Sequence, residues 1–177
     1  MKYGIYYAYW EKEWNGDYKY YIDKISKLGF DILEISCGAF SDYYTKDQEL
    51  IDIGKYAKEK GVTLTAGYGP HFNESLSSSE PNTQKQAISF WKETLRKLKL
   101  MDIHIVGGAL YGYWPVDYSK PFDKKRDLEN SIKNMKIISQ YAEEYDIMMG
   151  MEVLNRFEGY MSVSYTHLRA HETRGNL

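Results

Sequence analysis

The sequence predicts an α/β fold in which parallel strands are joined by helices, and two observations carry this prediction. Short runs of β-branched and aromatic residues alternate with longer segments whose apolar residues recur every three or four positions. The links that lead from a helix to the next strand are short, whereas those that lead from a strand to the next helix are long. Such an alternation implies parallel strands with right-handed crossovers.

The elements are predicted in the order β-α-β-α-β-α-β-α-β. The strands are the apolar runs at residues 3–7, 32–36, 63–67, 103–107 and 148–154. The helices carry one apolar stripe each, over residues 18–28, 50–57, 88–98 and 128–142. Asp17 is expected to cap the first helix and Gly29 to end it, while Gly61 closes the second. Pro81 is expected near the start of the third helix, where a missing N–H costs nothing.

The long links lie at residues 8–16, 37–46, 68–80 and 108–126. In a (β/α)8 barrel the chemistry sits at the carboxyl ends of the strands, on the face built by these links, and the short links of the other face serve stability. A doubly wound open sheet follows a similar logic, but no glycine-rich phosphate-binding turn opens the first helix, which favours the barrel. The functional face should then collect Tyr6, Trp10, Trp14, Gly67, His71, Ala109, Trp114, Glu152 and Glu158.

Composition and charge exclude several classes of protein. The 177 residues suit one domain, or part of one, and 43% hydrophobic with 27% charged residues is ordinary for a soluble globular chain. A net charge of −2, with acids and bases interleaved, offers no footprint for nucleic acid or an anionic membrane. A single cysteine, Cys37, excludes an internal disulfide, and no apolar run approaches the length of a membrane span. We therefore expect a cytoplasmic protein.

Glu152 is the most informative carboxylate in the chain. It interrupts the apolar run from Met148 to Leu154, and an ionised carboxylate in such a run is costly unless it is paired or holds a metal. The alternative interpretation is a plain strand end, with Glu152 exposed or bonded to Arg156. The residues of this stretch leave both interpretations open.

The tryptophans of the predicted links also allow two interpretations. Trp10, Trp14 and Trp114 lie outside the apolar stripes of the helices. An indole in a loop serves either as packing or as part of a binding surface, and three near one predicted face make a sugar platform as plausible as packing.

Four stretches of the sequence, at residues 1–10, 28–35, 107–115 and 152–158, carry a resemblance to a known family. They resemble the ketose 3-epimerases, in particular the branch of the D-psicose (D-allulose) 3-epimerases beside the D-tagatose 3-epimerases. The similarity runs in consistent order from Met1 to about Met161. It implies a (β/α)8 TIM barrel of the xylose isomerase-like type, a homodimer or homotetramer, and a divalent metal, most often manganese, with cobalt or magnesium as substitutes.

The resemblance also implies a reaction, the epimerisation of free ketohexoses such as D-fructose, D-psicose and D-tagatose at C3. At the position of Glu152 the family has a metal ligand that is also one of two acid/base carboxylates flanking C3. One carboxylate removes the C3 proton, an enediolate forms, and the other returns a proton to the opposite face. Glu158 matches a residue that hydrogen-bonds the substrate near O1. The remaining matched positions, which line the pocket, are Tyr6, Trp14, Gly67, Ala109 and Trp114.

The resemblance ends near Met161. The family's other metal ligands and its second catalytic glutamate come from later strands, and residues 162–173 instead resemble a run appended to unrelated reading frames as a cloning or sequencing artefact. A full barrel needs about 250 residues. We therefore expect residues 1–161 to be about the first four and a half βα units of an epimerase domain, residues 162–177 to be a non-family tail, and the chain alone to be inactive.

Two other functions compete with the epimerase. In a non-catalytic carbohydrate-binding or interaction domain, the loop aromatics would hold a sugar and Glu152 would be structural. Such a domain would bind its ligand without a metal. A metal-dependent phosphodiesterase acting on DNA is the second rival, but the sequence lacks a basic patch and further His or Asp ligands in its first half.

Overall fold

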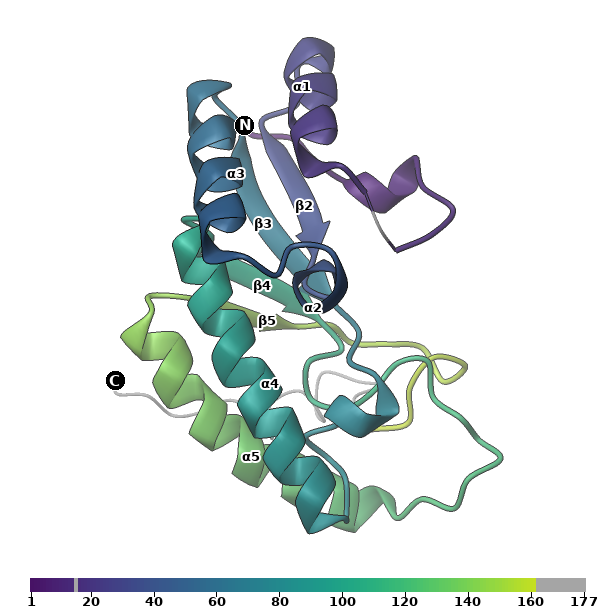
Figure 1. The fold of residues 1–177 in the computed structure, drawn as a ribbon. Coiled ribbons are helices and arrows are strands. Elements are labelled where there is room, and N and C mark those ends of the chain that lie inside the picture. Colours follow the sequence, from purple (N-terminus) through teal and green to yellow (C-terminus); the bar gives the residue numbers. More distant parts are fainter. Residues whose placement is uncertain (15, 162–177) are drawn as a thin grey trace. The chain divides into compact units, whose positions relative to one another are not determined.

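The computed structural model describes residues 1–14 and 16–161, and it confirms the predicted alternation of strands and helices (Figure 1). The strands are β1 (Gly4–Tyr6), β2 (Ile32–Ser36), β3 (Thr63–Tyr68), β4 (Ile105–Gly108) and β5 (Met148–Met151). The α-helices are α1 (Tyr18–Leu28), α2 (Ala39–Asp42), α3 (Asp47–Glu59), α4 (Pro81–Leu100) and α5 (Lys124–Glu144). Two short 3-10 helices, η1 (Tyr7–Tyr9) and η2 (Phe72–Glu74), lie in the long links. None of these described helices is long and apolar enough to cross a membrane.

The strands form one sheet in the order β1-β2-β3-β4-β5. The first three pair in parallel, and Tyr6 stands opposite Glu34, which in turn stands opposite Thr65. These three side chains therefore share one face of the sheet, because paired residues of neighbouring strands point the same way. Leu33 and Ile35 point to the other face and are fully buried. The fold class predicted from the sequence is thus confirmed.

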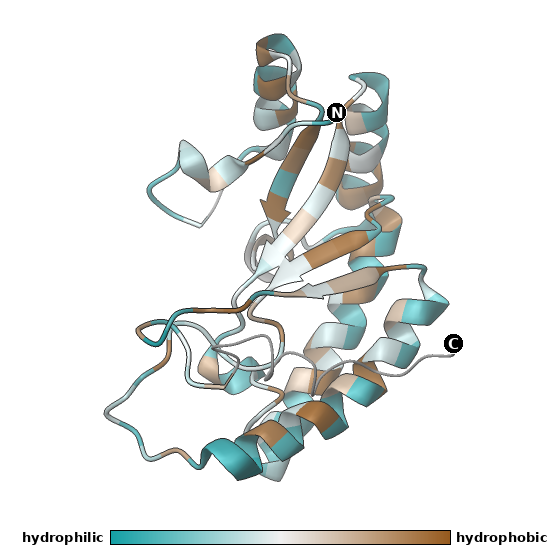
Figure 2. Ribbon diagram, turned by 180° about the vertical axis from the view of Figure 1, so that it is seen from behind, coloured by the Kyte–Doolittle hydropathy of each residue, from teal (hydrophilic) through white to brown (hydrophobic). Residues whose placement is uncertain are grey.

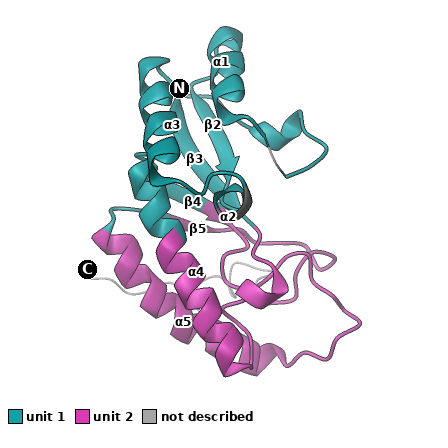
Figure 3. Cartoon of the chain, in the orientation of Figure 1, with its two compact units in different colours: residues 1–68, 94–106, 145–148 teal, residues 69–93, 107–144, 149–177 magenta. Residues whose placement is uncertain are grey.

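The chain divides into two compact units (Figure 3). Unit 1 comprises residues 1–68, 94–106 and 145–148, and unit 2 comprises residues 69–93, 107–144 and, in its described part, 149–161. In Figure 2 hydrophobic and hydrophilic residues alternate along the long helices, which is the pattern of helices with one buried face.

The core of unit 1 lies where helices α1 and α3 pack on strands β2 and β3. Helix α1 begins and ends as its sequence predicts, since the Asp17 carboxylate accepts hydrogen bonds from the Lys19 and Tyr20 amides at 3.0 and 3.2 Å. Gly29 ends it in the left-handed region, at φ 82°. Helix α3 packs so closely on the end of α4 that only a glycine fits at residue 54, where a Cβ atom would lie 2.6 Å from the Met101 carbonyl oxygen.

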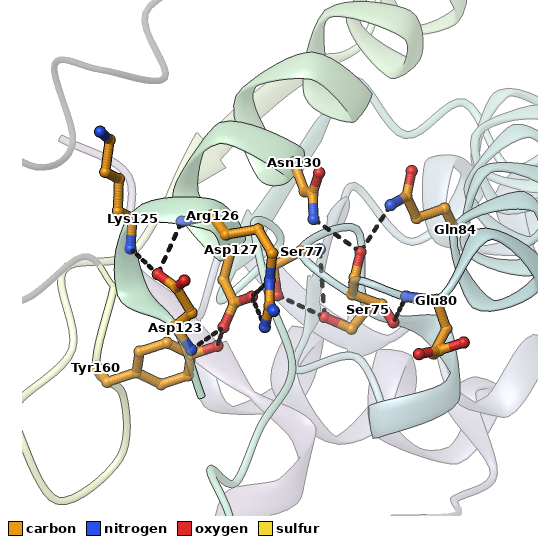
Figure 4. Close-up of polar contacts among 11 residues, drawn as sticks. Ser75, Ser77, Glu80, Gln84, Asp123, Lys125, Arg126, Asp127, Asn130 and Tyr160 are labelled. Atoms are coloured by element: carbon orange, nitrogen blue, oxygen red, sulfur yellow. Dashed lines mark hydrogen bonds and ion pairs between the residues drawn. The ribbon is translucent and has the colours of Figure 1, made fainter. Parts of the chain in front are cut away.

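In unit 2 polar side chains of helix α5 bond to neighbouring segments, and Figure 4 shows the contacts around Asp127 and Asn130. The Asn134 amide donates a hydrogen bond to the Leu76 carbonyl at 2.8 Å, and the Ser131 hydroxyl donates one to the Tyr111 carbonyl at 2.6 Å. The Tyr160 hydroxyl donates one to the buried Asp127 carboxylate at 2.8 Å. Helix α5 thereby binds the link after β3, the link after β4 and the segment after β5.

Two strand boundaries lie two or more residues from their predicted places, and one helix was not predicted. Strand β4 begins at Ile105 rather than at residue 103, because Asp102 turns the chain at φ 60° and the Ile103 amide still bonds to the Leu98 carbonyl of helix α4. Strand β5 ends at Met151 rather than at residue 154, so that Glu152 is the first residue beyond it. The short helix α2 was not predicted, since four residues are too few to show a helical period.

Gly54→Ala should lower the free energy of unfolding by about 1–2 kcal/mol. Overpacking against a backbone costs about 1–3 kcal/mol, and the better helix propensity of alanine returns at most about 1 kcal/mol. Urea unfolding followed by circular dichroism measures the difference. Lys55→Ala, at an exposed position of the same helix, is the matched control. Equal stability of the two variants would show that the close approach of α3 to Met101 is not required.

Candidate active site

In unit 1 the candidate site begins with Tyr6, the last residue of β1. Its side chain is half-buried, and burial raises the pKa of Tyr6 to about 12, opposed by a hydrogen bond with Ser36 and assisted by the negative charge of Glu34. The hydroxyl is therefore protonated at neutral pH and can donate a hydrogen bond. The ring of Trp14 lies 6.3 Å from that of Tyr6, tilted by 34°, and is 58% exposed. The structure thus brings together two of the predicted pocket residues.

Gly67 makes room for a neighbouring carboxylate. A Cβ atom on Gly67 would lie 2.9 Å from Oε1 of Glu34, so this position of β3 accepts no side chain unless Glu34 moves. Glu34 therefore crosses above β3 on the face that also carries Tyr6 and Thr65. The structure thus places Glu34 beside two predicted site residues, Tyr6 and Gly67.

In unit 2 Trp114 is held by the turn that follows β3. Its backbone amide donates a hydrogen bond to the Pro70 carbonyl at 2.8 Å. A Cβ atom on Gly69 would lie 2.9 Å from the Cβ of Trp114 and 3.1 Å from Cε3 of its indole. Trp114 thus packs on the turn at residues 69–70, and its side chain is half-buried there.

Glu152 follows β5 directly and is tied through its backbone. Its amide donates a hydrogen bond to the Gly108 carbonyl at 3.0 Å, and its carbonyl accepts one from the Tyr111 hydroxyl at 3.0 Å. The residue is exposed, and within residues 16–161 no ion pair joins it to Arg156. The carboxylate is therefore presented to solvent from a fixed backbone and is not neutralised by that arginine.

Two further predicted residues lie in the same unit as Glu152. Ala109 is buried beside Gly108, the residue that accepts the Glu152 amide, and its carbonyl accepts a hydrogen bond from the Gly112 amide at 3.2 Å. Glu158 lies in a turn organised by Asn155. The Asn155 side-chain oxygen accepts hydrogen bonds from the Phe157 and Glu158 amides at 2.8 and 3.2 Å. The Asn155 amide group also bonds to the Glu158 carboxylate. Ala109 and Glu158 are thus held by local turns.

Two residues expected on the functional face have local structural partners. The indole of Trp10 stacks on Tyr21 with 5.8 Å between ring centres and carries the Lys24 ammonium 4.4 Å above it. His71 precedes η2, and its backbone amide donates to the Glu74 carboxylate at 2.9 Å. Trp10 therefore packs against helix α1, and His71 helps to begin a short helix.

The metal that the family resemblance implies does not find a complete site among the described residues. In the described portion of the chain no three His, Cys, Asp or Glu side chains gather to hold an ion. Glu152 offers one carboxylate, whereas a hard divalent cation takes about six oxygen donors. The described residues therefore do not fit a full metal centre. The predicted tail at residues 162–177 lies outside the described residues.

Sequence reasoning missed Tyr111 and Asn155. Tyr111 lies inside one of the stretches that carry the family resemblance, but its bond to Glu152 joins residues 41 positions apart, which no local pattern shows. Asn155 gave a signal that could have been used, because an asparagine side chain commonly accepts hydrogen bonds from the backbone amides two or three residues further along and so begins a turn.

Curated proteins named D-psicose 3-epimerase are similar to this chain in sequence. The chain is 56% identical to the D-psicose 3-epimerase of Enterocloster bolteae over 161 residues, which are 91% of this chain and 54% of that protein. It is 47% identical to the D-psicose 3-epimerase of Ruminiclostridium cellulolyticum over 161 residues, with the same coverage. The chain spans about half the length of the curated relatives it matches.

Solved structures agree with the curated relatives. The crystal structure of D-psicose 3-epimerase with D-tagatose from Clostridium cellulolyticum H10 superposes with a TM-score of 0.92 at 43% identity, covering 97% of this chain and 60% of that one. A D-psicose 3-epimerase structure determined in the presence of D-fructose also gives 0.92, at 39% identity over 98% of this chain and 61% of that one. The resemblance to ketose 3-epimerases is thereby confirmed.

A family model described as xylose isomerase-like TIM barrel matches residues 22–173. Its match covers most of the chain and agrees with the parallel sheet and with the solved relatives. This chain belongs to the xylose isomerase-like TIM barrel family.

Proposed function

We propose that this chain carries part of the active site of a ketose 3-epimerase that interconverts D-fructose and D-psicose. The observation that carries the proposal is Glu152, whose carboxylate is exposed at the carboxyl end of β5 while both of its backbone groups are bonded. In a (β/α)8 barrel this is the end of the strand at which catalytic residues stand. The similarity to D-psicose 3-epimerases supplies the reaction.

The reaction needs a base and an acid on opposite faces of C3. The C3 proton is acidic only through the neighbouring C2 carbonyl, so a carboxylate must remove it in place. Glu152 accepts this proton, and the electron pair of the C–H bond moves to form an enediolate. A proton delivered to the other face of C3 inverts that centre and restores the ketone. Glu152 serves one face, and a second acid/base group serves the other.

The other candidate residues hold the sugar and exclude water. In the roles that the family resemblance gives them, the protonated hydroxyl of Tyr6 donates a hydrogen bond to a substrate oxygen, and the indoles of Trp14 and Trp114 pack on C–H surfaces of the sugar. The Glu158 carboxylate accepts a hydrogen bond from the substrate near O1 of the ketose. Gly67 leaves the space that the Glu34 carboxylate occupies beside β3. Ala109, a small residue, takes the pocket-lining position that the family resemblance gives it.

A divalent metal belongs to the proposal, with manganese first and cobalt or magnesium as substitutes. Glu152 would supply one of its ligands. Because the described residues hold no complete set of ligands, no step above depends on the ion. Assembly as a homodimer or homotetramer and a cytoplasmic location stay predictions from the sequence.

A chimaera tests the proposed function. Residues 1–161 replace the matching segment of the D-psicose 3-epimerase of Enterocloster bolteae, and liquid chromatography follows the conversion of D-fructose to D-psicose with manganese present. Conversion is the expected result. A chimaera that is folded by circular dichroism and binds the sugar, but does not convert it, would favour the non-catalytic carbohydrate-binding domain and contradict the proposal.

In this chimaera Glu152→Gln should lower turnover by about 10²–10⁴-fold, the range in which general acid/base groups contribute. The amide keeps the size of the side chain but cannot accept the C3 proton. Steady-state kinetics with D-fructose measure the loss. Glu143→Gln makes the same change at an exposed position of helix α5 and serves as the control. Turnover within about threefold of the unmodified chimaera would rule out the role given to Glu152, since such a ratio is under about 1 kcal/mol.

Trp114→Ala should lower kcat/KM about tenfold, which corresponds to about 1.4 kcal/mol of lost aromatic packing on the sugar. Trp114→Phe keeps an aromatic ring packed against Gly69 and should retain most of the activity. Kinetics of both variants give the comparison. An unchanged kcat/KM in Trp114→Ala would show that this indole only packs in its loop.

Residues 1–177 expressed alone should not form D-psicose from D-fructose, even with manganese added. One carboxylate cannot serve both faces of C3. The assay is run beside a calorimetric titration with manganese. Clear conversion together with micromolar metal binding would show that this chain suffices for the reaction.

A further inference from the structure

Tyr111 is a buried residue that bonds to the backbone of Glu152, the candidate catalytic residue. Its side chain is 3% exposed, and its hydroxyl donates a hydrogen bond to the Glu152 carbonyl at 3.0 Å. The carbonyl of Tyr111 in turn accepts a hydrogen bond from the Ser131 hydroxyl at 2.6 Å, and Ser131 is fully buried on helix α5. A chain of two hydrogen bonds therefore runs from α5 through Tyr111 to the backbone of Glu152.

The two backbone bonds of Glu152 constrain both of its peptide groups. The amide before its Cα is bonded to the Gly108 carbonyl at 3.0 Å, and the carbonyl after its Cα is bonded to Tyr111. With both peptide planes held, the φ and ψ angles of Glu152 are set, and so is the direction of its Cα–Cβ bond. Val153, the next residue, is exposed and provides no buried anchor of its own. Tyr111 is thus what holds the second peptide plane.

The far end of the same segment has a separate attachment. Tyr160 donates to the buried Asp127 carboxylate at 2.8 Å, as Figure 4 shows, and burial together with that carboxylate raises the pKa of Tyr160, which keeps its hydroxyl a donor. The Tyr118 hydroxyl donates to the Arg156 carbonyl and also lies 3.2 Å from the Gly159 carbonyl, so it bonds to the backbone on either side of Glu158. Tyr111 therefore acts at the Glu152 end of the segment, and Tyr118 acts at the Glu158 end.

We propose that Tyr111 is a positioning residue for proton transfer at C3, because its hydroxyl fixes the backbone from which the Glu152 carboxylate projects. This inference rests on the proposed function. Misplacing a reacting group by about 1 Å can cost about 10²-fold in rate. Without the hydroxyl, water can still reach the exposed residue and bond to its carbonyl, so the backbone loosens without losing its fold. Tyr118, in contrast, bonds to the backbone on either side of Glu158, the residue that is assigned to substrate binding.

The test compares two deletions of a single oxygen atom in the chimaera. Tyr111→Phe should lower kcat about tenfold, within the rate cost of misplacing a reacting group, and should leave KM nearly unchanged. Tyr118→Phe should raise KM and leave kcat nearly unchanged. Tyr141→Phe, which removes a hydroxyl from a ring that packs under the Lys92 ammonium, should match the unmodified chimaera. Ser131→Ala, which withdraws the bond to the Tyr111 carbonyl, should lower kcat in the same direction but less.

A merely structural role predicts a different pattern. General loosening of unit 2 would change kcat and KM in the same proportion in Tyr111→Phe and Tyr118→Phe and would lower both melting temperatures. That pattern, or an unchanged kcat in Tyr111→Phe, would overturn the inference while the active unmodified chimaera still upholds the epimerase. An unmodified chimaera that is folded but inactive would overturn the proposed function and this inference with it.

Discussion

The parallel pairing of β1, β2 and β3 is the constraint on which the candidate site of unit 1 depends. Tyr6, Glu34 and Thr65 stand in one row across the three strands, and Leu33 and Ile35 lie on the face that the helices cover. A slip of one residue in β2 would carry the Glu34 carboxylate to the helix face and an isoleucine or leucine to the other. Burial of the apolar residues under α1 and α3 therefore also determines which polar groups surround Tyr6.

Two glycines let neighbouring side chains approach the backbone closely, and this places further residues of the candidate site. Gly67 leaves the space that the Glu34 carboxylate occupies, and Gly69 leaves the space on which Trp114 rests. Neither glycine has a backbone angle in the left-handed region, so the absence of a side chain is what these positions require. Each position thus places a neighbouring side chain, one in each unit.

Local signals explain why the helices were predicted better than the site. The ends of α1 follow from Asp17 and Gly29, and the start of α4 follows from Pro81, all of which act within one turn of the chain. The start of β4 was misplaced because the turn at Asp102, a non-glycine residue at φ 60°, gives no distinctive sequence pattern. The seven predicted site residues were placed on the functional face by the lengths of the links, and their individual roles came from the family resemblance. Their supports, such as Tyr111, bond across long sequence separations that periodicity does not reveal.

Several of these supporting bonds come from one element, helix α5. An amphipathic helix normally buries an apolar stripe, yet the buried face of α5 also carries Asp127, Ser131 and Asn134. Each of these polar groups bonds to a loop: Asp127 to Tyr160, Ser131 to Tyr111 and Asn134 to the Leu76 carbonyl. A buried polar group without a partner costs about 1–3 kcal/mol, so any shift of a loop leaves an acceptor or donor of α5 unsatisfied. Apolar contacts alone would let the loops slide, whereas these directional bonds hold them in one register, and the loop that begins with Glu152 is among them.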